Sequence, residues 1–198
     1  MNFPLLGQEA LNDPGARLRR LWEVLNIVVM PGVFNALLAR LVQFEGFEAL
    51  YISGAGVTNT LMGLPDHAFI SLPEMAQVCG YITRAVSIPA VADADTGYGE
   101  ALQVAYAVRT LERAGLAGIH LEDQVSPKRC GHLEGKEVIP KEAMVAKIRA
   151  AVNARENPNF VIIARTDARA VEGLQAAIDR AKAYLEAGAD AIFPEALQ

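Results

Sequence analysis

The stretch NFVIIARTDA, residues 159–168, contains the pattern that decides the fold. A short run of apolar residues ends in an arginine, a threonine and an aspartate. Five further stretches have this form: NIVVMPG (26–32), EALYISGAG (48–56), IPAVADADTG (88–97), AGIHLEDQ (117–124) and ADAIFPEA (189–196). Near-continuous apolar runs of this length are typical of strands that lie in a parallel sheet and are buried on both faces.

Helical segments separate these predicted strands. SLPEMAQVCGYI opens with a capping box from Ser71 to Glu74 and then repeats apolar residues at helical spacing. PKEAMVAKIRAAV begins at Pro140, a residue that favours the first turn of a helix, and continues with an apolar stripe. Strands that alternate with helices in this way indicate an α/β protein with a helix-covered parallel sheet.

A weak internal repeat narrows the choice of α/β fold. Residues 100–123 resemble residues 172–195 when one gap is allowed, which aligns Gly115 with Gly188. Repeated strand–helix units favour a TIM-type (β/α)₈ barrel over a sheet with a single switch point. A dinucleotide-binding fold is disfavoured because only one glycine follows the first predicted strand.

Six predicted strands fall short of the eight that a barrel needs in about 250 residues. We therefore interpret residues 1–198 as a single (β/α) barrel domain, truncated at its C-terminus, and expect the natural protein to continue beyond Gln198. Alone, the chain is expected to expose strand edges and apolar surface and not to be a well-behaved monomer.

Composition excludes several classes of partner. The net charge is −5 and no long block of like charge occurs, so no nucleic-acid partner is expected. No apolar run reaches the length of about 18 residues that a membrane span needs, and the N-terminus lacks a signal-peptide pattern. Two cysteines are too few for a disulfide framework, so a cytoplasmic location is expected.

Polar residues end the predicted strands, at the end of a parallel barrel where active sites lie. Because side chains alternate along a strand, Asp93 and Asp95 share one face, as do His120 and Glu122. Clustered carboxylates repel one another unless a hard cation neutralises them. Asp93, Asp95 and Glu122 therefore predict a Mg²⁺ site, with Mn²⁺ as an alternative ion. The competing interpretation pairs these acids with Lys or Arg, and His120 is expected to pack within the sheet.

The two cysteines occupy different settings. Cys79 falls on the apolar stripe of a predicted helix and is expected in the core. Cys130 lies in a connection of about 17 residues, long for a strand-to-helix loop. Two cations and a histidine flank it, a setting that favours a reactive thiol able to give or take a proton: Lys128, Arg129 and His132. The alternative is an exposed loop cysteine beside solvated charges.

Seven motifs in a fixed order resemble the isocitrate lyase / phosphoenolpyruvate mutase superfamily, from about Val29 to the last residue. They are SGAG (53–56), GLPD (63–66), DADTGYG (93–99), HLEDQ (120–124), KRCGH (128–132), ARTDA (164–168) and FPEA (193–196). KRCGH resembles the lyase motif of this superfamily, whose phosphonate mutases lack the cysteine. FPEA and the short connections resemble the methylisocitrate lyase branch. Ala55 replaces a glycine that many relatives have, and the residues after His132 differ from those of the best-known members.

The resemblance implies a (β/α)₈ barrel with Mg²⁺ held by Asp93, Asp95 and Glu122, and a homo-oligomer, by family resemblance a tetramer. It implies a small dicarboxylate or tricarboxylate as substrate. The methylisocitrate lyase branch implies cleavage of 2-methylisocitrate to succinate and pyruvate. Cys130 would protonate the leaving carbanion, and Arg165 would hold a carboxylate or oxyanion.

Further positions are implied by the same resemblance. The oxo-acid carboxylate would bind the backbone at Ser53, Gly54 and Ala55. The remaining substrate-binding residues are Tyr51, Gly131, His132 and Arg165, and the remaining catalytic ones are Asp66, His132 and Glu195, with the general base unassigned. Two alternatives remain open. The first is a related enzyme that acts on isocitrate, dimethylmalate or oxaloacetate, or a phosphonate mutase. The second is an inactive, truncated chain that only binds Mg²⁺ and dicarboxylates.

Overall fold

The structure is a computed structural model and describes residues 11–25, 27–131, 133 and 135–197. Within these ranges six parallel strands form one sheet, and each strand pairs with the next along the chain. The strands are β1 (Gly32–Val33), β2 (Leu50–Ile52), β3 (Ala90–Asp93), β4 (Gly118–Glu122), β5 (Val161–Thr166) and β6 (Ala191–Pro194). Since neighbouring strands are parallel, every connection must cross back over the sheet.

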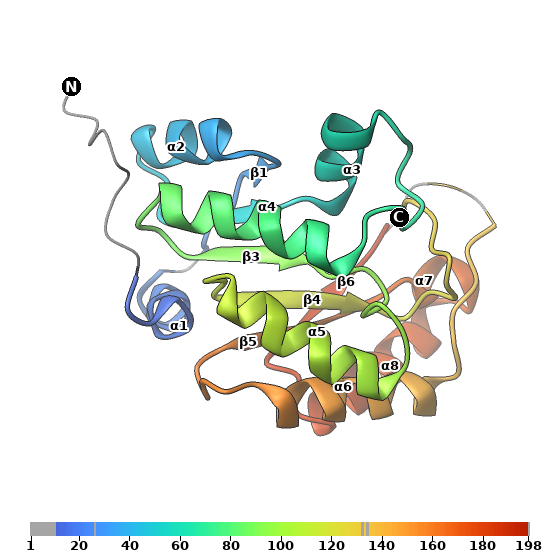
Figure 1. Ribbon diagram of the computed structural model, residues 1–198. Helices are drawn as coiled ribbons and strands as arrows, with labels where there is room; N and C mark the ends of the chain where they lie inside the picture. The colour runs from blue at the N-terminus through green and yellow to red at the C-terminus, as the bar shows by residue number, and fades with distance from the viewer. Residues whose placement is uncertain (1–10, 26, 132, 134, 198) are drawn as a thin grey trace.

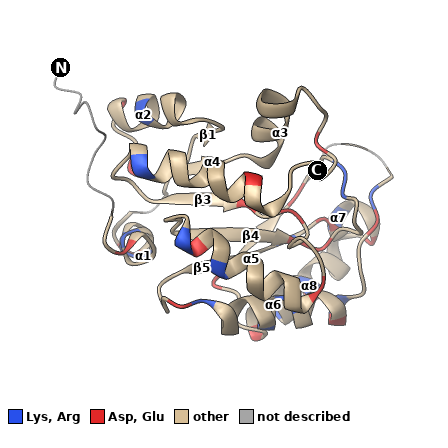
Figure 2. Cartoon of the chain, in the orientation of Figure 1, with Lys and Arg blue, Asp and Glu red and all other residues tan. Residues whose placement is uncertain are grey.

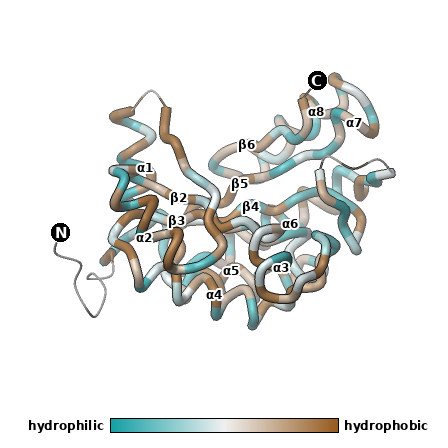
Figure 3. Tube along the Cα trace, turned by 90° about the horizontal axis from the view of Figure 1, so that it is seen from above, coloured by the Kyte–Doolittle hydropathy of each residue, from teal (hydrophilic) through white to brown (hydrophobic). Residues whose placement is uncertain are grey.

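Helices make these crossovers and cover the sheet. They are α1 (Pro14–Val24), α2 (Ala36–Phe44), α3 (Gly54–Met62), α4 (Leu72–Ala85), α5 (Ala101–Arg113), α6 (Lys141–Ala154), α7 (Ala168–Val171) and α8 (Leu174–Glu186). Figures 1 and 3 show α4 and α5 lying outside β3 and β4. Sequential parallel strands with outer helices are the arrangement of a (β/α) barrel. The predicted TIM-type α/β fold, with six strands in this chain, is confirmed.

Two apolar clusters follow from the alternation of side chains along the strands. Ala92 and Leu121 belong to the larger cluster, which lies between the sheet and its covering helices and includes the buried Cys79. Val91 and Val161 point the other way, toward Leu18 of α1 in the second cluster. Helix α1 therefore lies at the amino ends of the strands, which leaves their carboxyl ends to polar residues (Figure 1).

The predicted boundaries were wrong at two places. In the first apolar run only Gly32 belongs to a strand, and Ile27 and Val29 are 79% and 59% exposed. Pairing with β2 begins at Pro31, whose carbonyl accepts from the Tyr51 N–H. Proline has no backbone N–H to donate, and the strand starts one residue later, at Gly32. The predicted strand run 48–56 also extends too far, since β2 ends at Ile52 and the segment after it is not a strand. That segment contains α3, because Ser53 caps that helix by accepting a hydrogen bond from the N–H of Gly56 at 3.1 Å.

Local signals elsewhere were read correctly. The capping box at Ser71 is present, with Glu74 accepting from the Ser71 N–H at 2.9 Å. The internal repeat corresponds to α5–β4 and α8–β6, and the aligned Gly115 and Gly188 both have positive φ, at 88° and 105°. Both glycines end a helix in the left-handed conformation that a residue with a Cβ rarely adopts.

Charged residues are interspersed along the helices rather than gathered into one basic face (Figure 2). In the described ranges no helix combines the length and the apolar character needed to cross a membrane.

Asp13 gives a test of how α1 is attached. Its carboxylate caps α1 at the Ala16 N–H (2.9 Å) and also accepts from Asn157 (2.9 Å) and Asn159 (2.8 Å) in the segment before β5. Asp13→Ala should lower the free energy of unfolding in urea by about 1–2 kcal/mol, the upper part of the range for helix caps. Asn35→Ala, which removes an exposed cap that accepts a hydrogen bond from the Leu38 N–H at 2.9 Å, should cost less. Equal losses would mean that the bonds to Asn157 and Asn159 contribute nothing.

Candidate active site

Asp93 and Asp95 lie together at the carboxyl end of β3. Asp93 is the last residue of the strand, and its Oδ1 accepts a hydrogen bond from the Asp95 N–H at 2.9 Å. Asp95 takes a positive φ of 46°, which turns the chain back toward the strand end. Both carboxylates are buried, at 6% and 5% exposure.

Glu122 ends the neighbouring strand, β4, and is fully buried. The register of β4 and β5 places Arg165 directly beside it. The structure thus brings Asp93, Asp95, Glu122 and Arg165 to the same end of the sheet, as the sequence pattern predicts.

Lys128, from the connection between β4 and α6, inserts its ammonium group among these acids. Its Nζ lies 2.5 Å from Asp66 Oδ1 and 3.0 Å from Asp95 Oδ1, and the side chain is 2% exposed. Although burial opposes it, the charges of Asp95 and Asp93 raise the pKa of Lys128 above its usual value. Asp66, which the sequence resemblance gives as a catalytic residue, is therefore paired with a lysine.

Burial separates the protonation states of the acids. Burial, followed by the charge of Asp93, raises the pKa of Asp95 to about 7. Burial raises the pKa of Glu122 well above its ordinary range, against the opposing effect of Arg165. Burial would raise that of Asp93 too, but His120, Lys128 and the Asp95 N–H hold its pKa below the usual value. Asp93 is thus the carboxylate that stays ionised without a metal ion.

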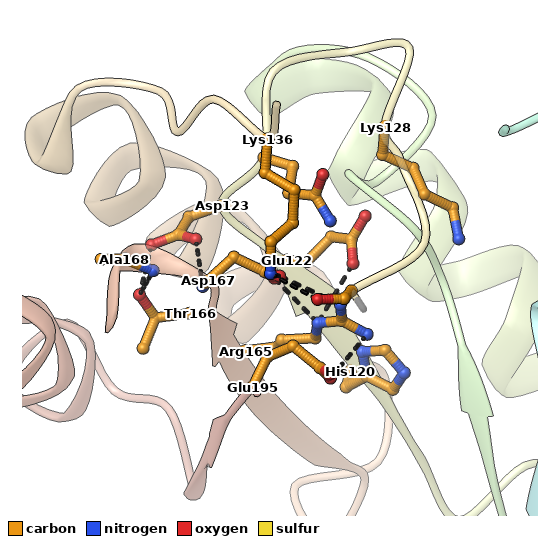
Figure 4. A network of polar contacts seen from close by, with 12 residues as sticks. His120, Glu122, Asp123, Lys128, Lys136, Arg165, Thr166, Asp167, Ala168 and Glu195 are labelled. Atoms are coloured by element: carbon orange, nitrogen blue, oxygen red, sulfur yellow. Dashed lines mark hydrogen bonds and ion pairs between the residues drawn. The ribbon is translucent and has the colours of Figure 1, made fainter. Parts of the chain in front are cut away.

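Arg165 is the centre of the polar network in Figure 4. Its Nε and Nη2 donate to the two oxygens of Asp167 at 2.9 and 3.3 Å. Nε also lies 3.2 Å from Glu122 Oε2, and Nη1 lies 3.2 Å from Glu195 Oε2. The guanidinium group stands over the ring of Phe193 on β6, with 5.4 Å between its Cζ and the ring centroid. One buried cation thus joins the ends of β4, β5 and β6.

The Cys130 connection lies against this network. A Cβ added to Gly131 would stand 2.5 Å from Glu195 Oε1 and 2.6 Å from Arg165 Nη2, so any larger residue here would push the Glu195 and Arg165 side chains aside. Cys130 itself is a half-buried free thiol, whereas Cys79 is fully buried, as predicted. His132, a predicted catalytic and substrate-binding residue, lies outside the described residues.

Tyr51 and His120 form a buried pair beside Asp93. The Tyr51 hydroxyl lies 2.5 Å from His120 Nε2, the rings are stacked, and that nitrogen is 3.4 Å from Asp93 Oδ1. Burial lowers the pKa of His120, and burial followed by the charge of Asp93 raises that of Tyr51 well above its usual value. His120 packs within the sheet, as expected, and also contacts two predicted site residues.

The predicted carboxylate-binding backbone forms the start of α3. Ser53 is the N-cap, Gly54 is buried and Ala55 is half-buried. A Cβ on Gly54 would stand 2.7 Å from Asp93 Oδ2, so this helix start touches the acidic cluster. The first N–H groups of a helix have no partner within it and carry a partial positive charge, which suits an anion.

The donor chemistry at this end suits a hard divalent cation. Asp95 Oδ1 and Glu122 Oε2 are buried and lie 3.0 Å from Lys128 Nζ and 3.2 Å from Arg165 Nε, and Glu122 Oε1 is buried and accepts no hydrogen bond from the described residues. Among the described residues, however, no three or more His, Cys, Asp or Glu side chains converge closely enough to hold a metal ion. Mg²⁺ commonly binds one or two carboxylates directly and retains several waters. The residues therefore fit Mg²⁺ in their chemistry, while Lys128 supplies the positive charge among them in this structure.

Comparison with known proteins identifies the family. Residues 18–198 match the phosphoenolpyruvate phosphomutase family. The chain belongs to this family. It is 56% identical over 192 residues to a 2-methylisocitrate lyase of Aeropyrum pernix, which covers 97% of this chain and 61% of the relative. The chain spans about three-fifths of the length of such curated relatives.

Solved structures of this phosphomutase family have the same fold. An oxaloacetate acetylhydrolase in complex with 3,3-difluorooxalacetate superposes with a TM-score of 0.91 at 39% identity, over 96% of this chain and 65% of that one. A phosphonopyruvate hydrolase in complex with oxalate and Mg²⁺ superposes with a TM-score of 0.86 at 34% identity, over 94% and 64%. The resemblance to the superfamily that the motifs indicated is confirmed.

Sequence reasoning missed four residues of the polar network around Arg165 and the acidic cluster. Lys128 was assigned to the surroundings of the thiol, and His120 only to packing. Asp167 and Lys136 received no role, although Asp167 shares a strand face with Arg165 and that spacing was a usable signal. Nothing in the spacing of Lys136 indicates that it is buried with its ammonium 2.7 Å from Asp167 Oδ1.

The raised pKa of Asp95 predicts a pH dependence with a definite sign. The folded protein keeps this proton between about pH 4 and pH 7 and the unfolded chain does not, so the stabilisation is lost as pH rises through that window. In excess EDTA, the wild type should lose free energy of unfolding relative to Asp95→Asn by about 1 kcal/mol per pH unit over this range. Urea unfolding at several pH values measures it.

Asp13→Asn is the matched control for that measurement. The pKa of Asp13 is lowered, because hydrogen bonds led by the Ala16 N–H outweigh the effect of burial. Its contribution is therefore present above about pH 4 and is lost as pH falls, which is the opposite sign. A pH-independent difference between wild type and Asp95→Asn would contradict the assignment of the buried proton to Asp95.

Proposed function

We propose that the protein is a Mg²⁺-dependent carbon–carbon lyase that cleaves 2-methylisocitrate to succinate and pyruvate. The observation that carries the proposal is the close approach of the Cys130 connection to Arg165 and Glu195 at Gly131. It puts the residue that follows Cys130 beside a buried cation, at the end of the barrel where active sites lie. The curated relative of 56% identity, described as a 2-methylisocitrate lyase, supports this choice of substrate.

Asp93 and Asp95, with Glu122 nearby, would hold the metal ion. A bound Mg²⁺ would polarise the oxygens of the oxo-acid half of the substrate and stabilise negative charge that develops on them. The burial of the Asp95 carboxylate, and the buried Glu122 Oε1 that accepts no hydrogen bond from the described residues, support this role. The solved phosphonopyruvate hydrolase with oxalate and Mg²⁺ supports the choice of ion.

The remaining groups suit the two charged ends of the substrate. The start of α3 at Ser53, Gly54 and Ala55 would bind the oxo-acid carboxylate through its backbone N–H groups. Arg165 would hold a second carboxylate or the oxyanion, because its guanidinium group is fixed by Asp167 and shielded from water.

Cleavage needs one proton removed and one proton supplied. A base takes the proton of the substrate hydroxyl, the adjacent carbon–carbon bond breaks, and its electron pair leaves on the succinate half. Cys130 would donate its thiol proton to that carbon, and the hydroxyl carbon becomes the carbonyl of pyruvate. Burial and the charge of Asp93 raise the pKa of Tyr51, so its hydroxyl stays protonated and cannot take up a proton as the base; Asp66 and Glu195 remain candidates.

A second function follows from the comparison with the oxaloacetate acetylhydrolase structure. The same site would then act on oxaloacetate or another 2-hydroxy- or 2-oxo-dicarboxylate. The test is to incubate the purified protein and Mg²⁺ with 2-methylisocitrate, isocitrate, dimethylmalate and oxaloacetate, and to follow products by NMR. Equal amounts of pyruvate and succinate from the first compound support the proposal. Faster turnover of another compound supports the second function, and no turnover at all supports the inactive chain.

Cys130→Ser should lower kcat by about 10²–10⁴-fold, the usual contribution of general acid catalysis, because an alcohol is a far weaker proton donor. KM should change little, since the ground-state contacts come from other groups. Cys79→Ser is the control: it places a hydroxyl in the core, so it should lower stability and leave kcat nearly unchanged. Near-full turnover by Cys130→Ser would place the proton donor elsewhere.

Removal of the metal should stop the reaction. Excess EDTA is expected to abolish turnover and added Mg²⁺ to restore it, and Asp93→Ala should abolish both turnover and Mg²⁺ binding in a calorimetric titration. Circular dichroism should show that the Asp93→Ala variant keeps its fold, because the substitution removes a ligand and not an apolar core residue. Unchanged turnover in EDTA would contradict a metal-dependent lyase.

A further inference from the structure

The connection that carries Cys130 is fixed firmly at its base. The Val125 N–H donates to the carbonyl of Glu137 at 2.8 Å, and the Ile139 N–H donates to the carbonyl of Asp123 at 2.8 Å. The two sides of the connection therefore leave β4 and enter α6 as a short antiparallel pair. This pairing holds the base but does not reach Cys130.

Little apolar packing holds the part around Cys130. Val125 and Leu133 are 40% and 51% exposed. A cavity of about 340 Å³ lies against this part of the connection, lined by residues that include His67, Arg129 and Lys136. The position of the thiol must therefore depend on polar contacts.

Two buried side chains bind the backbone on either side of Cys130. Gln124, 1% exposed, donates from Nε2 to the carbonyl of Arg129 at 2.9 Å and accepts from the Arg129 N–H at 3.1 Å. Lys136 donates from Nζ to the carbonyl of Gly131 at 2.6 Å. The residues before and after the cysteine are thus each tied to a side chain that is itself fixed.

Lys136 also connects this backbone to the arginine of the site. Its Nζ lies 2.7 Å from Asp167 Oδ1, and its side chain is 4% exposed. The same carboxylate accepts both hydrogen bonds from Arg165. The Asp167 N–H is in turn held by Asp123 Oδ1 at 2.9 Å, so the anchor is part of the rigid barrel end (Figure 4).

We propose that Gln124 and Lys136 are positioning residues that hold the backbone on both sides of Cys130 at the end of the barrel that carries Arg165. Lys136 acts through Asp167, because this carboxylate binds both Lys136 and Arg165 and so links the backbone next to Cys130 to the guanidinium group. The role of the thiol rests on the proposed function. The positioning itself does not, because it concerns the resting protein.

The test is the rate of alkylation of Cys130 by iodoacetamide, measured by mass spectrometry of its peptide without substrate. The rate is followed against pH, so that the plateau for the thiolate separates exposure of the thiol from its ionisation. Lys136→Met should raise the plateau rate by about tenfold, because a hydrogen bond from a charged group no longer opposes opening of the connection. Lys136→Arg should return most of the rate toward the wild-type value.

Lys182→Met, on the exposed face of α8, removes the same charge away from the site and should leave the plateau rate unchanged. Gln124→Ala provides a second variant, should Lys136→Met fail to fold, and is also expected to raise the plateau rate. The proposal is overturned if a folded Lys136→Met protein has the plateau alkylation rate of the wild type. If only Gln124→Ala folds, a wild-type plateau rate in that variant overturns it.

Turnover of the substrate gives an independent readout. If the lyase is active, Lys136→Met should lower kcat and leave KM nearly unchanged, with recovery in Lys136→Arg. Should no substrate be turned over, the proposed function fails while the alkylation result stands. An equal loss of kcat in Lys136→Arg and Lys136→Met would mean that a cationic hydrogen-bond donor at this position does not hold the thiol in place. That result would overturn the positioning role.

Discussion

A buried guanidinium group surrounded by carboxylates is the interaction on which this end of the molecule depends. Arg165 faces Glu122, Asp167 and Glu195, which come from three consecutive strand ends. Removing charges from water is costly, so such a cluster persists only where each charge has a partner in good geometry. The bidentate pair with Asp167 meets this condition. The arginine therefore holds the strand ends in register and faces the place where an anionic substrate would bind.

The sequence allowed two interpretations of the acidic cluster, a metal site or a set of acids paired with Lys or Arg. The structure gives a physical basis for both. Lys128 pairs with Asp95 and Asp66, as the competing interpretation required. Yet Glu122 Oε1 is buried and accepts no hydrogen bond from the described residues, which is a poor resting state for a buried acid. A lysine that reaches in from the Cys130 connection can act as the counter-ion of these acids. Any divalent ion that binds here must therefore share or displace that charge.

The periodicity of the sequence predicted the positions of side chains that lie on strands and helices. The alternation of side chains was enough to bring Asp93, Glu122 and Arg165 to one end, and the helical stripe was enough to bury Cys79. It failed at Gly32, where pairing with β2 decides the boundary, and at α3, where the cap at Ser53 outweighs the glycines that follow. The partners of Lys128 and Lys136 could not be predicted, because contacts of a long connection depend on how it folds back and not on any repeat.

The network also explains why a thiol can be placed accurately on a long connection. Loops position reactive groups poorly unless their backbone is fixed by contacts of its own. Here the carbonyls on either side of Cys130 bind Gln124 and Lys136, and Gly131 lets the backbone approach Arg165 within the space that a Cβ would fill. Because Lys136 and Arg165 share Asp167, a shift of one changes the setting of the other. The backbone next to the cysteine and the arginine are thus linked through a single carboxylate, although they come from different parts of the chain.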